Sequence, residues 1–151
     1  MRRHKFAAIA AAAAILLTFS VLTNAQTRGR YYADIPFEFA FADDIYDAGS
    51  FEAILEIPSY DANIFTLRDE DGMTLKRTVI LRSGNRSKDE NVKFVFDHYD
   101  RGYVLKEIVA PGFGFKVARP SEAVWVYITE NGRARSETVA VVLRRKSELA
   151  R

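Results

Sequence analysis

His98 and its two aspartate neighbours are side chains of the types that general acid–base chemistry uses. His98 lies between Asp97 and Asp100, and a carboxylate beside a histidine can orient the imidazole as a general base. Neighbours along a strand point to opposite faces, however, so Asp97 and His98 do not converge if the segment is extended. No partner nucleophile motif accompanies them. We therefore predict no catalytic residue and expect that the protein is not an enzyme.

The run Asp69-Glu70-Asp71-Gly72 places three carboxylates together, a composition that suggests calcium. An EF-hand loop needs oxygen ligands at alternating positions and a glutamate near the twelfth position, and the run does not match that template. Asp-Gly is instead typical of a tight hairpin turn. We therefore expect a solvated turn here, no metal site and no cofactor.

Phe113, Phe115 and Tyr99 are the residues that we single out as possible contacts for a ligand or partner. The segment Phe113-Gly114-Phe115 follows Pro111-Gly112, and glycine-flanked aromatic residues on a loop often border a pocket. Plain packing at the start of a strand is the alternative. If the loop borders a site, replacing Phe115 with alanine should reduce binding and cost little stability.

The N-terminus has the three-part pattern of a secretory signal peptide. Residues 1–5 are cationic, an apolar, alanine-rich stretch follows, and Ala25 is a small residue at the expected cleavage position. We expect residues 1–25 to be a cleaved signal peptide and the remaining chain to be exported, to the periplasm or the extracellular space. The alternative is that the segment stays uncleaved as a membrane anchor. In that case it is the only part of the chain that we expect to contact the membrane.

Cleavage of this segment changes the charge of the protein. The chain of 151 residues has 22 Lys and Arg and 20 Asp and Glu. Residues 1–25 contain three of the basic residues and no acidic residue, so the other 126 residues have 19 basic and 20 acidic residues, a net charge of −1. A nearly neutral surface has no general field that attracts nucleic acid. The absence of cysteine excludes disulfides, thiol catalysis and a lipid anchor on cysteine.

Residues 31–146 are predicted to form a single β domain, with 26–30 as a short polar leader and 147–151 as a frayed tail. Apolar and other residues alternate with a period of two, and turn dipeptides such as Asp-Gly and Asn-Gly separate the runs. Strands are expected over 35–41, 51–57, 63–68, 74–82, 92–96, 103–109, 123–129 and 139–143. These are about eight antiparallel strands in up-and-down order, as a barrel or a sandwich.

The segment 120–130 fits two secondary structures. Pro120-Ser121-Glu122 can open a helix. The run from Ala123 to Thr129 is short and rich in β-branched and aromatic residues, which favours a strand. We prefer the strand.

Several short motifs resemble those of a widespread group of small secreted bacterial proteins. These motifs are Ile35-Pro36-Phe37-Glu38-Phe39, Ala48-Gly49-Ser50-Phe51, Asp71-Gly72, and Phe94-Val95-Phe96 through Tyr99, Tyr103 and Leu105 to Pro111-Gly112. The resemblance covers residues 35–112 and implies a bacterial exported β domain without catalytic residues. The chain departs from the group after Pro111, where the group is often more charged and helix-like.

We expect an exported, non-catalytic binding module that holds a small apolar ligand or a partner protein of the cell envelope. An eight-stranded barrel can just enclose one small ligand. The alternative is a structural or interaction protein of the envelope with a filled core. Small residues such as Ala40, Ala53 and Gly49 leave room for a cavity, whereas the phenylalanines favour a filled core. The sequence therefore leaves open both the ligand-binding and the structural function. It also leaves open the oligomeric state.

Overall fold

The computed structural model describes residues 27–57, 63–84, 88, 90–129 and 137–145. The predicted signal peptide and the predicted tail lie outside these residues. The elements in chain order are β1 (Thr27–Ile35), β2 (Phe39–Phe41), β3 (Asp44–Tyr46), β4 (Gly49–Ile57), β5 (Asn63–Arg68), β6 (Thr74–Ser83), β7 (Lys93–Tyr99), β8 (Gly102–Ala110), β9 (Phe113–Lys116), α2 (Glu122–Ile128), β10 (Glu137–Val142) and β11 (Arg144–Arg145).

The described residues form a protein of the all-β class, as predicted, with one short helix. The strands follow the order β10-β7-β8-β9-β6-β5-β4-β1-β11, and neighbours in this order are antiparallel. β2 pairs with β3 and, in parallel, with β8. The described part of the chain is thus a mixed sheet of 11 strands. It has more strands than the eight expected, and the pairs β1–β4 and β6–β9 depart from an up-and-down order.

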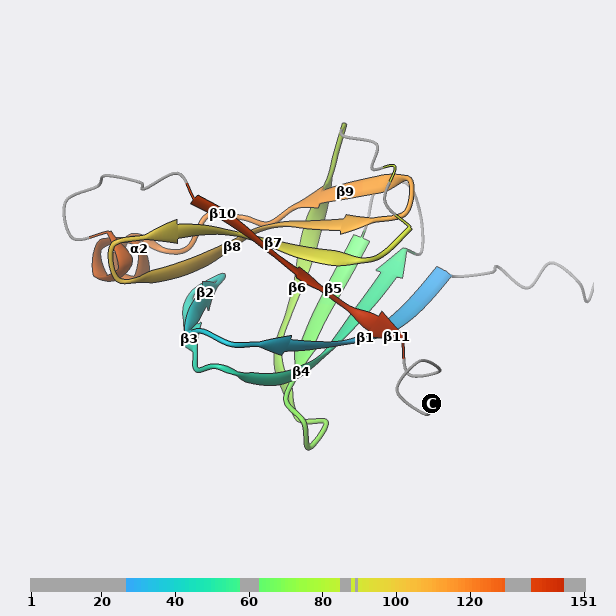
Figure 1. Ribbon diagram of the computed structural model, residues 1–151, viewed down its shortest axis with the longest axis horizontal. Helices are drawn as coiled ribbons and strands as arrows, with labels where there is room; N and C mark the ends of the chain where they lie inside the picture. The colour runs from blue at the N-terminus through green and yellow to red at the C-terminus, as the bar shows by residue number, and fades with distance from the viewer. Residues whose placement is uncertain (1–26, 58–62, 85–87, 89, 130–136, 146–151) are drawn as a thin grey trace, which may run out of the picture.

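The two ends of this strand order are consecutive segments of the chain. β10 pairs with β7 through six residue pairs, and β11 pairs with β1. Only Leu143 separates β10 from β11, and its N–H donates to the carbonyl oxygen of Val92 at 2.8 Å. Figure 1 shows β10 crossing from β7 toward β1, where β11 continues it. One segment therefore bonds to both ends of the sheet.

Phenylalanine rings fill the space that the strands enclose. Phe65 meets Phe41 and Phe94 edge to face at centroid distances of 5.3 and 5.7 Å, and Phe96 meets Phe39 in the same way at 5.4 Å. All five side chains are at most 1% exposed. Because edge-to-face pairs add about 0.5–1.5 kcal/mol to the energy of burial, they stabilise the strands that carry them.

Two of the expected boundaries in the N-terminal part are wrong. The polar leader predicted for 26–30 includes residues of β1, which begins at Thr27 and pairs with β4 over nine positions. The strand predicted over 35–41 is interrupted between β1 and β2, at Pro36–Glu38. Proline has no N–H to donate to a ladder, so the pairing with β4 ends at Ile35.

The strand preferred for 123–129 is a helix, α2. The N–H of Trp125 donates to the carbonyl oxygen of Ser121 at 2.9 Å, and the N–H of Thr129 donates to the carbonyl oxygen of Trp125 at 2.9 Å. Helical spacing gathers Val124, Trp125 and Ile128 on one side, where they pack against the sheet. This tertiary contact outweighs the local β propensity.

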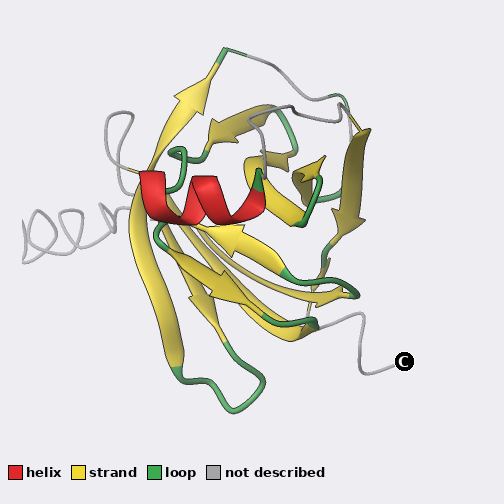
Figure 2. Ribbon diagram, turned by 90° about the vertical axis from the view of Figure 1, so that its left-hand side faces the viewer, coloured by secondary structure: helices red, strands yellow, loops and turns green. Residues whose placement is uncertain are grey.

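Helix α2 lies beside the turn between β7 and β8 (Figure 1). The N–H of Arg101, in that turn, donates to the carbonyl oxygen of Ile128 at 3.2 Å. Tyr99 and Val104 face the helix side of the sheet and form a small second core with Ile128. Figure 2, in which the helix is red, shows α2 lying across the strands. The helix and the strands thus form two layers at this place.

The segment Phe113-Gly114-Phe115, which the sequence allows either as a loop bordering a pocket or as packing at a strand start, lies in strand β9 between β6 and β8. Phe115 is 0% exposed in the main core, while Phe113 is 38% exposed beneath the guanidinium of Arg82, at 4.0 Å from its ring centroid. Phe115 is thus packed at the start of a strand, which is the alternative stated above. At this buried position it cannot contact a ligand at the surface.

Replacing Phe115 with alanine should lower the free energy of unfolding by about 3–5 kcal/mol, because it removes a buried ring and leaves a cavity. Urea unfolding followed by circular dichroism measures this change. Phe113→Ala is the matched control, and should cost about 1 kcal/mol or less because the ring is partly exposed. Equal losses for the two variants would contradict the placement of β9.

Candidate functional site

A pocket of about 220 Å³ lies between the sheet and the segment that leads into α2. Its lining is mostly apolar and is open to solvent on one side. The residues come from the end of β7, the middle of β8 and the chain from Val117 to α2. They are Asp97, Tyr99, Val104, Leu105, Lys106, Val117, Ala118, Arg119, Pro120 and Trp125.

An irregularity in strand β8 shapes one wall of this pocket. Val95 pairs with Glu107 but Phe96 pairs with Leu105, so Lys106 is an extra residue at this point of the ladder. Such a bulge redirects a side chain and leaves its backbone groups unpaired in the ladder. The carbonyl oxygen of Lys106 accepts instead from the N–H of Val117 at 2.9 Å. This bond fixes the start of the segment that forms the opposite wall.

Charged groups surround the apolar surface of the pocket. The ammonium of Lys106 lies 3.0 Å from one carboxylate oxygen of Asp97 and 3.2 Å from the other. The guanidinium of Arg119 stacks over the ring of Trp125, 3.9 Å from its centroid. The ring of Trp125 in turn meets the ring of Tyr99 at 4.9 Å and 72°. The pocket therefore combines two aromatic rings, two cations and one carboxylate.

Tyr99 places a phenol at the base of this arrangement. Burial raises the pKa of Tyr99 above its usual 10.0, and the negative charge of Asp97 raises it further, while Lys106 and Arg119 lower it. The side chain is 7% exposed. The phenol is thus neutral at physiological pH and can donate a hydrogen bond.

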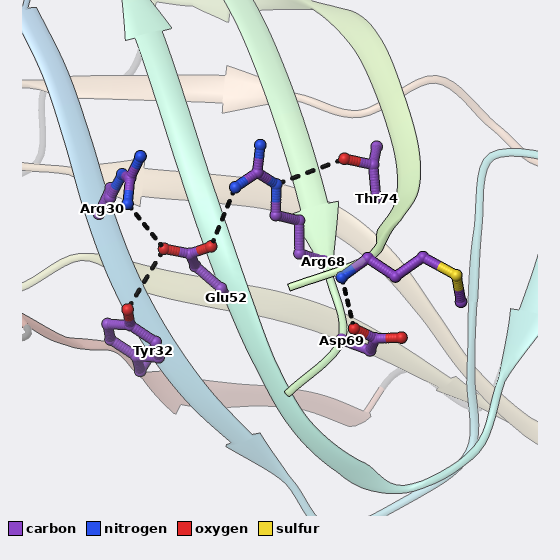
Figure 3. Close-up of polar contacts among 7 residues, drawn as sticks. Arg30, Tyr32, Glu52, Arg68, Asp69 and Thr74 are labelled. Carbon is purple, nitrogen blue, oxygen red and sulfur yellow. Dashed lines mark hydrogen bonds and ion pairs between the residues drawn. The ribbon is translucent and has the colours of Figure 1, made fainter. Parts of the chain in front are cut away.

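A second hollow, of about 330 Å³, lies on the outer face of β1 and β4, next to the turn between β5 and β6. Its central group is the carboxylate of Glu52, a residue that is 8% exposed. Arg30 and Arg68 lie 3.7 and 3.5 Å from its two oxygens, and the hydroxyl of Tyr32 donates to it at 3.2 Å. Figure 3 shows these three side chains converging on Glu52 from both sides.

This network holds the strands together across the sheet. Tyr32, Glu52 and Arg68 are consecutive partners in the β1–β4–β5 ladder, and Arg68 also donates to the hydroxyl of Thr74 at 3.3 Å. Burial, and then the charge of Glu52, raise the pKa of Tyr32 above its usual 10.0. Because the oxygens of Glu52 already have three partners, the network is structural rather than open to a ligand.

The acidic run that suggested calcium is the turn predicted from Asp-Gly. The N–H of Gly72 donates to the carbonyl oxygen of Asp69 at 3.1 Å, and Gly72 has a φ of 83°, which favours glycine. The carboxylate of Asp69 accepts from the N–H of Met73 at 2.7 Å (Figure 3). Among the described residues, no three His, Asp or Glu side chains are grouped so that they could hold a metal ion.

His98 lies within β7 rather than at a turn. Its Nδ1 is 3.6 Å from a carboxylate oxygen of Glu137 on β10, and its ring stacks on Tyr103 at 4.4 Å. Asp97 bonds to Lys106 in the pocket described above. The two neighbours thus have separate partners, as expected for adjacent positions on a strand.

The structure brings one of the three predicted contact residues into the pocket. Tyr99 lines it, whereas Phe113 and Phe115 lie on β9 and are not among its lining residues. Trp125 and Arg119 were not expected at a site, because their segment was predicted to continue into a strand. The Pro120-Ser121-Glu122 helix start was the signal that could have found them.

No protein-family profile, curated protein or solved structure matches the chain. The resemblance to small secreted bacterial proteins therefore stays a prediction. In the part of the chain that the structure describes, no helix has the length and apolar character needed to cross a bilayer.

Removing the hydroxyl of Tyr99 should change how stability depends on pH. A phenol with a raised pKa stabilises the fold fully below about pH 10, and this contribution is lost as the pH rises through the folded-state pKa. When the pH is raised from about 9 to about 11, the free energy of unfolding should therefore fall less in Tyr99→Phe than in the unchanged protein. Urea midpoints at both pH values measure the loss. Val126→Ala, an exposed change on helix α2, should lose as much stability as the unchanged protein over the same pH range. If Tyr99→Phe also shows the full loss, the assignment to Tyr99 is refuted.

Replacing Glu52 with glutamine should lower the free energy of unfolding by about 1–3 kcal/mol, because a buried charged acceptor is removed from two arginines and a phenol. Glu56→Gln is the control. One of its partners is Arg77, 3.3 Å away, whose side chain is 60% exposed, and such ion pairs contribute about 0–1 kcal/mol. If both substitutions cost the same, the Glu52 network does not tie the strands together as described.

Proposed function

We propose that the protein is an exported, non-catalytic binding module whose site is the pocket between the sheet and α2. One observation carries this proposal. The pocket places an apolar floor, two aromatic rings and a few charged groups together on one open surface, which is the composition of small-molecule and peptide-side-chain sites. Its 220 Å³ is below the usual 300–1,000 Å³ of drug-sized sites, so the occupant is a single small group.

The enclosed core is a poorer place for a ligand than this pocket. The inward positions that would have to stay small for a cavity hold Phe39, Phe65, Phe94 and Phe96, each at most 1% exposed. Their rings contact one another, and close-packed interiors leave few voids larger than a water molecule. A ligand inside the sheet would have to displace these contacts.

We include in this proposal that the sheet closes into a barrel and that the protein is exported. The pairing of β10 with β7 and of β11 with β1 supports a sheet that closes on itself, which would leave few exposed strand edges. The cationic start, apolar stretch and Ala25 of the N-terminal segment support export to the periplasm or beyond.

A structural or interaction protein of the envelope is the second candidate. The observation that favours it is an exposed apolar pair on the outer face of β6. Val79 and Leu81 are 58% and 69% exposed, and side chains two positions apart on a strand share a face. A partner protein could cover this pair without using the pocket.

Trp125 provides a direct test, because it is the chain's single tryptophan and lines the pocket. Native mass spectrometry of protein purified without denaturation should show an added small mass. Removing that molecule and adding it back should change the fluorescence of Trp125 in a saturable way. Val104→Trp, which narrows the pocket, should abolish the response, while Val79→Trp on β6 is the matched control and should preserve it.

The binding proposal would be contradicted if the native mass spectrum showed only the bare monomer and if adding cell extract left the fluorescence of Trp125 unchanged. Together these two results would favour the second candidate. A dimer mass that is lost in a Val79→Asp Leu81→Asp variant would point the same way, since it would show association through the face of β6.

A further inference from the structure

We propose that the pocket beside α2 recognises a carboxylate attached to a small apolar or aromatic group, with Arg119 as the residue that binds the carboxylate. This inference rests on the proposed function, because it assigns a ligand chemistry to the same pocket. The argument uses three features of the lining, which are the charge of Arg119, the hydroxyl of Tyr99 and the size of the apolar surface.

Arg119 has a cation that the described residues do not neutralise. Its guanidinium contacts the face of Trp125 at 3.9 Å, and no described carboxylate lies within ion-pair distance of it. Lys106, by contrast, already has both oxygens of Asp97. Stacking on an indole holds the plane of a guanidinium while leaving its edge N–H groups available for bidentate hydrogen bonds. Arg119 is thus held in place to bind a planar anion.

Tyr99 adds a neutral donor next to this cation. Its hydroxyl makes no hydrogen bond with another described residue, and both Arg119 and Lys106 lie close enough to lower the pKa of the phenol. Two cations against one carboxylate give the lining a net charge of +1. Charge complementarity therefore selects an anionic group over a cationic one, and the phenol can donate to the second oxygen of a carboxylate.

The apolar surface of the pocket selects the rest of the ligand. The rings of Tyr99 and Trp125 meet at 72°, and Val104 and Leu105 of β8 add apolar side chains to the lining. A volume of 220 Å³ is equivalent to about seven waters at their share of liquid volume, enough for one phenyl ring and a carboxylate. A free aromatic acid and the C-terminal residue of a peptide both present this chemistry.

The experiment titrates the purified protein with 3-phenylpropionate and reads the fluorescence of Trp125. Its neutral match is 3-phenylpropionamide, which has the same shape without the charge. A second pair, N-acetyl-glycyl-phenylalanine with a free or an amidated C-terminus, tests the peptide source. We expect each acid to bind at least about tenfold more tightly than its amide, the effect of one charge-assisted bidentate contact.

Three substitutions locate the effect on Arg119. Arg119→Gln should remove the preference for the acid, so that acid and amide bind alike. Arg119→Lys keeps the charge and should retain part of the preference, which guards against a loss caused by misfolding. Lys88→Gln is the matched control. Lys88 is an exposed cation that precedes β7, at the opposite end of that strand from Tyr99, and its loss should leave the preference intact.

The outcomes separate this inference from the proposed function. Equal binding of acid and amide to the unchanged protein would overturn the role of Arg119 while supporting a pocket for apolar groups. Absence of any saturable response to all four compounds at millimolar concentration would overturn the carboxylate inference, and the native mass spectrum would still decide the proposed function. A preference confined to the peptide pair would identify a C-terminal segment as the ligand.

Discussion

Phenylalanine rings packed edge to face in the core fix the positions of strands that are distant in sequence. Phe41, Phe65, Phe94 and Phe96 come from three different strands, β2, β5 and β7, and each ring contacts a ring from another part of the chain. In a protein without cysteine, this burial is the main term that opposes the loss of chain entropy. The rest of the sheet depends on it, because the same rings decide which face of each strand points inward.

Because the interior is filled, the binding that we propose takes place on the outer surface. There the sheet offers two different solutions to the placement of polar groups. Around Glu52 two arginines and a phenol share one carboxylate, which stabilises the ladder. Beside α2 the bulge at Lys106 and the short helix leave an apolar hollow with a stacked guanidinium at its edge. The same kinds of side chain therefore serve stability in one place and, in our proposal, binding in the other.

Strands and turns were predictable where a short stretch of sequence is enough to determine them. Alternation predicted β4 and the hairpin of β7 and β8, and Asp71-Gly72 predicted the turn between β5 and β6. Pairing between distant strands was not predictable, because the alternation that places a residue on a face does not name the partner strand. The polar start of β1 was missed for a related reason. In a strand with one solvated face, residues such as Arg30 belong outside the core, and they look like a leader when the partner strand is unknown.

The pocket was harder to predict than the fold. Trp125 lies in a run whose β-branched content favours a strand, and only the contact of Val124 and Ile128 with the sheet makes the helix the better solution. The bulge that turns Lys106 toward Asp97 has no signature in the sequence around it. The place of Phe115 was left open by the sequence, because a glycine between aromatic residues fits both a loop and the tight packing of β9 against β8.

The segment from Glu137 to Arg145 makes the order of chain synthesis important. Glu137 is opposite His98 on β7, and Arg144 is opposite Tyr32 on β1. Among the described strands, the first to be synthesised, β1, therefore gains its second neighbour only when the last, β11, has been made. Contacts between such distant positions form slowly, because most of the chain must be ordered before they are gained. Until that step, β1 and β7 both have an unpaired side and can pair with other chains. A nascent chain of this protein therefore stays in an unfinished, aggregation-prone state until Glu137–Arg145 has been synthesised, and during that period a chaperone can still bind it as an extended polypeptide.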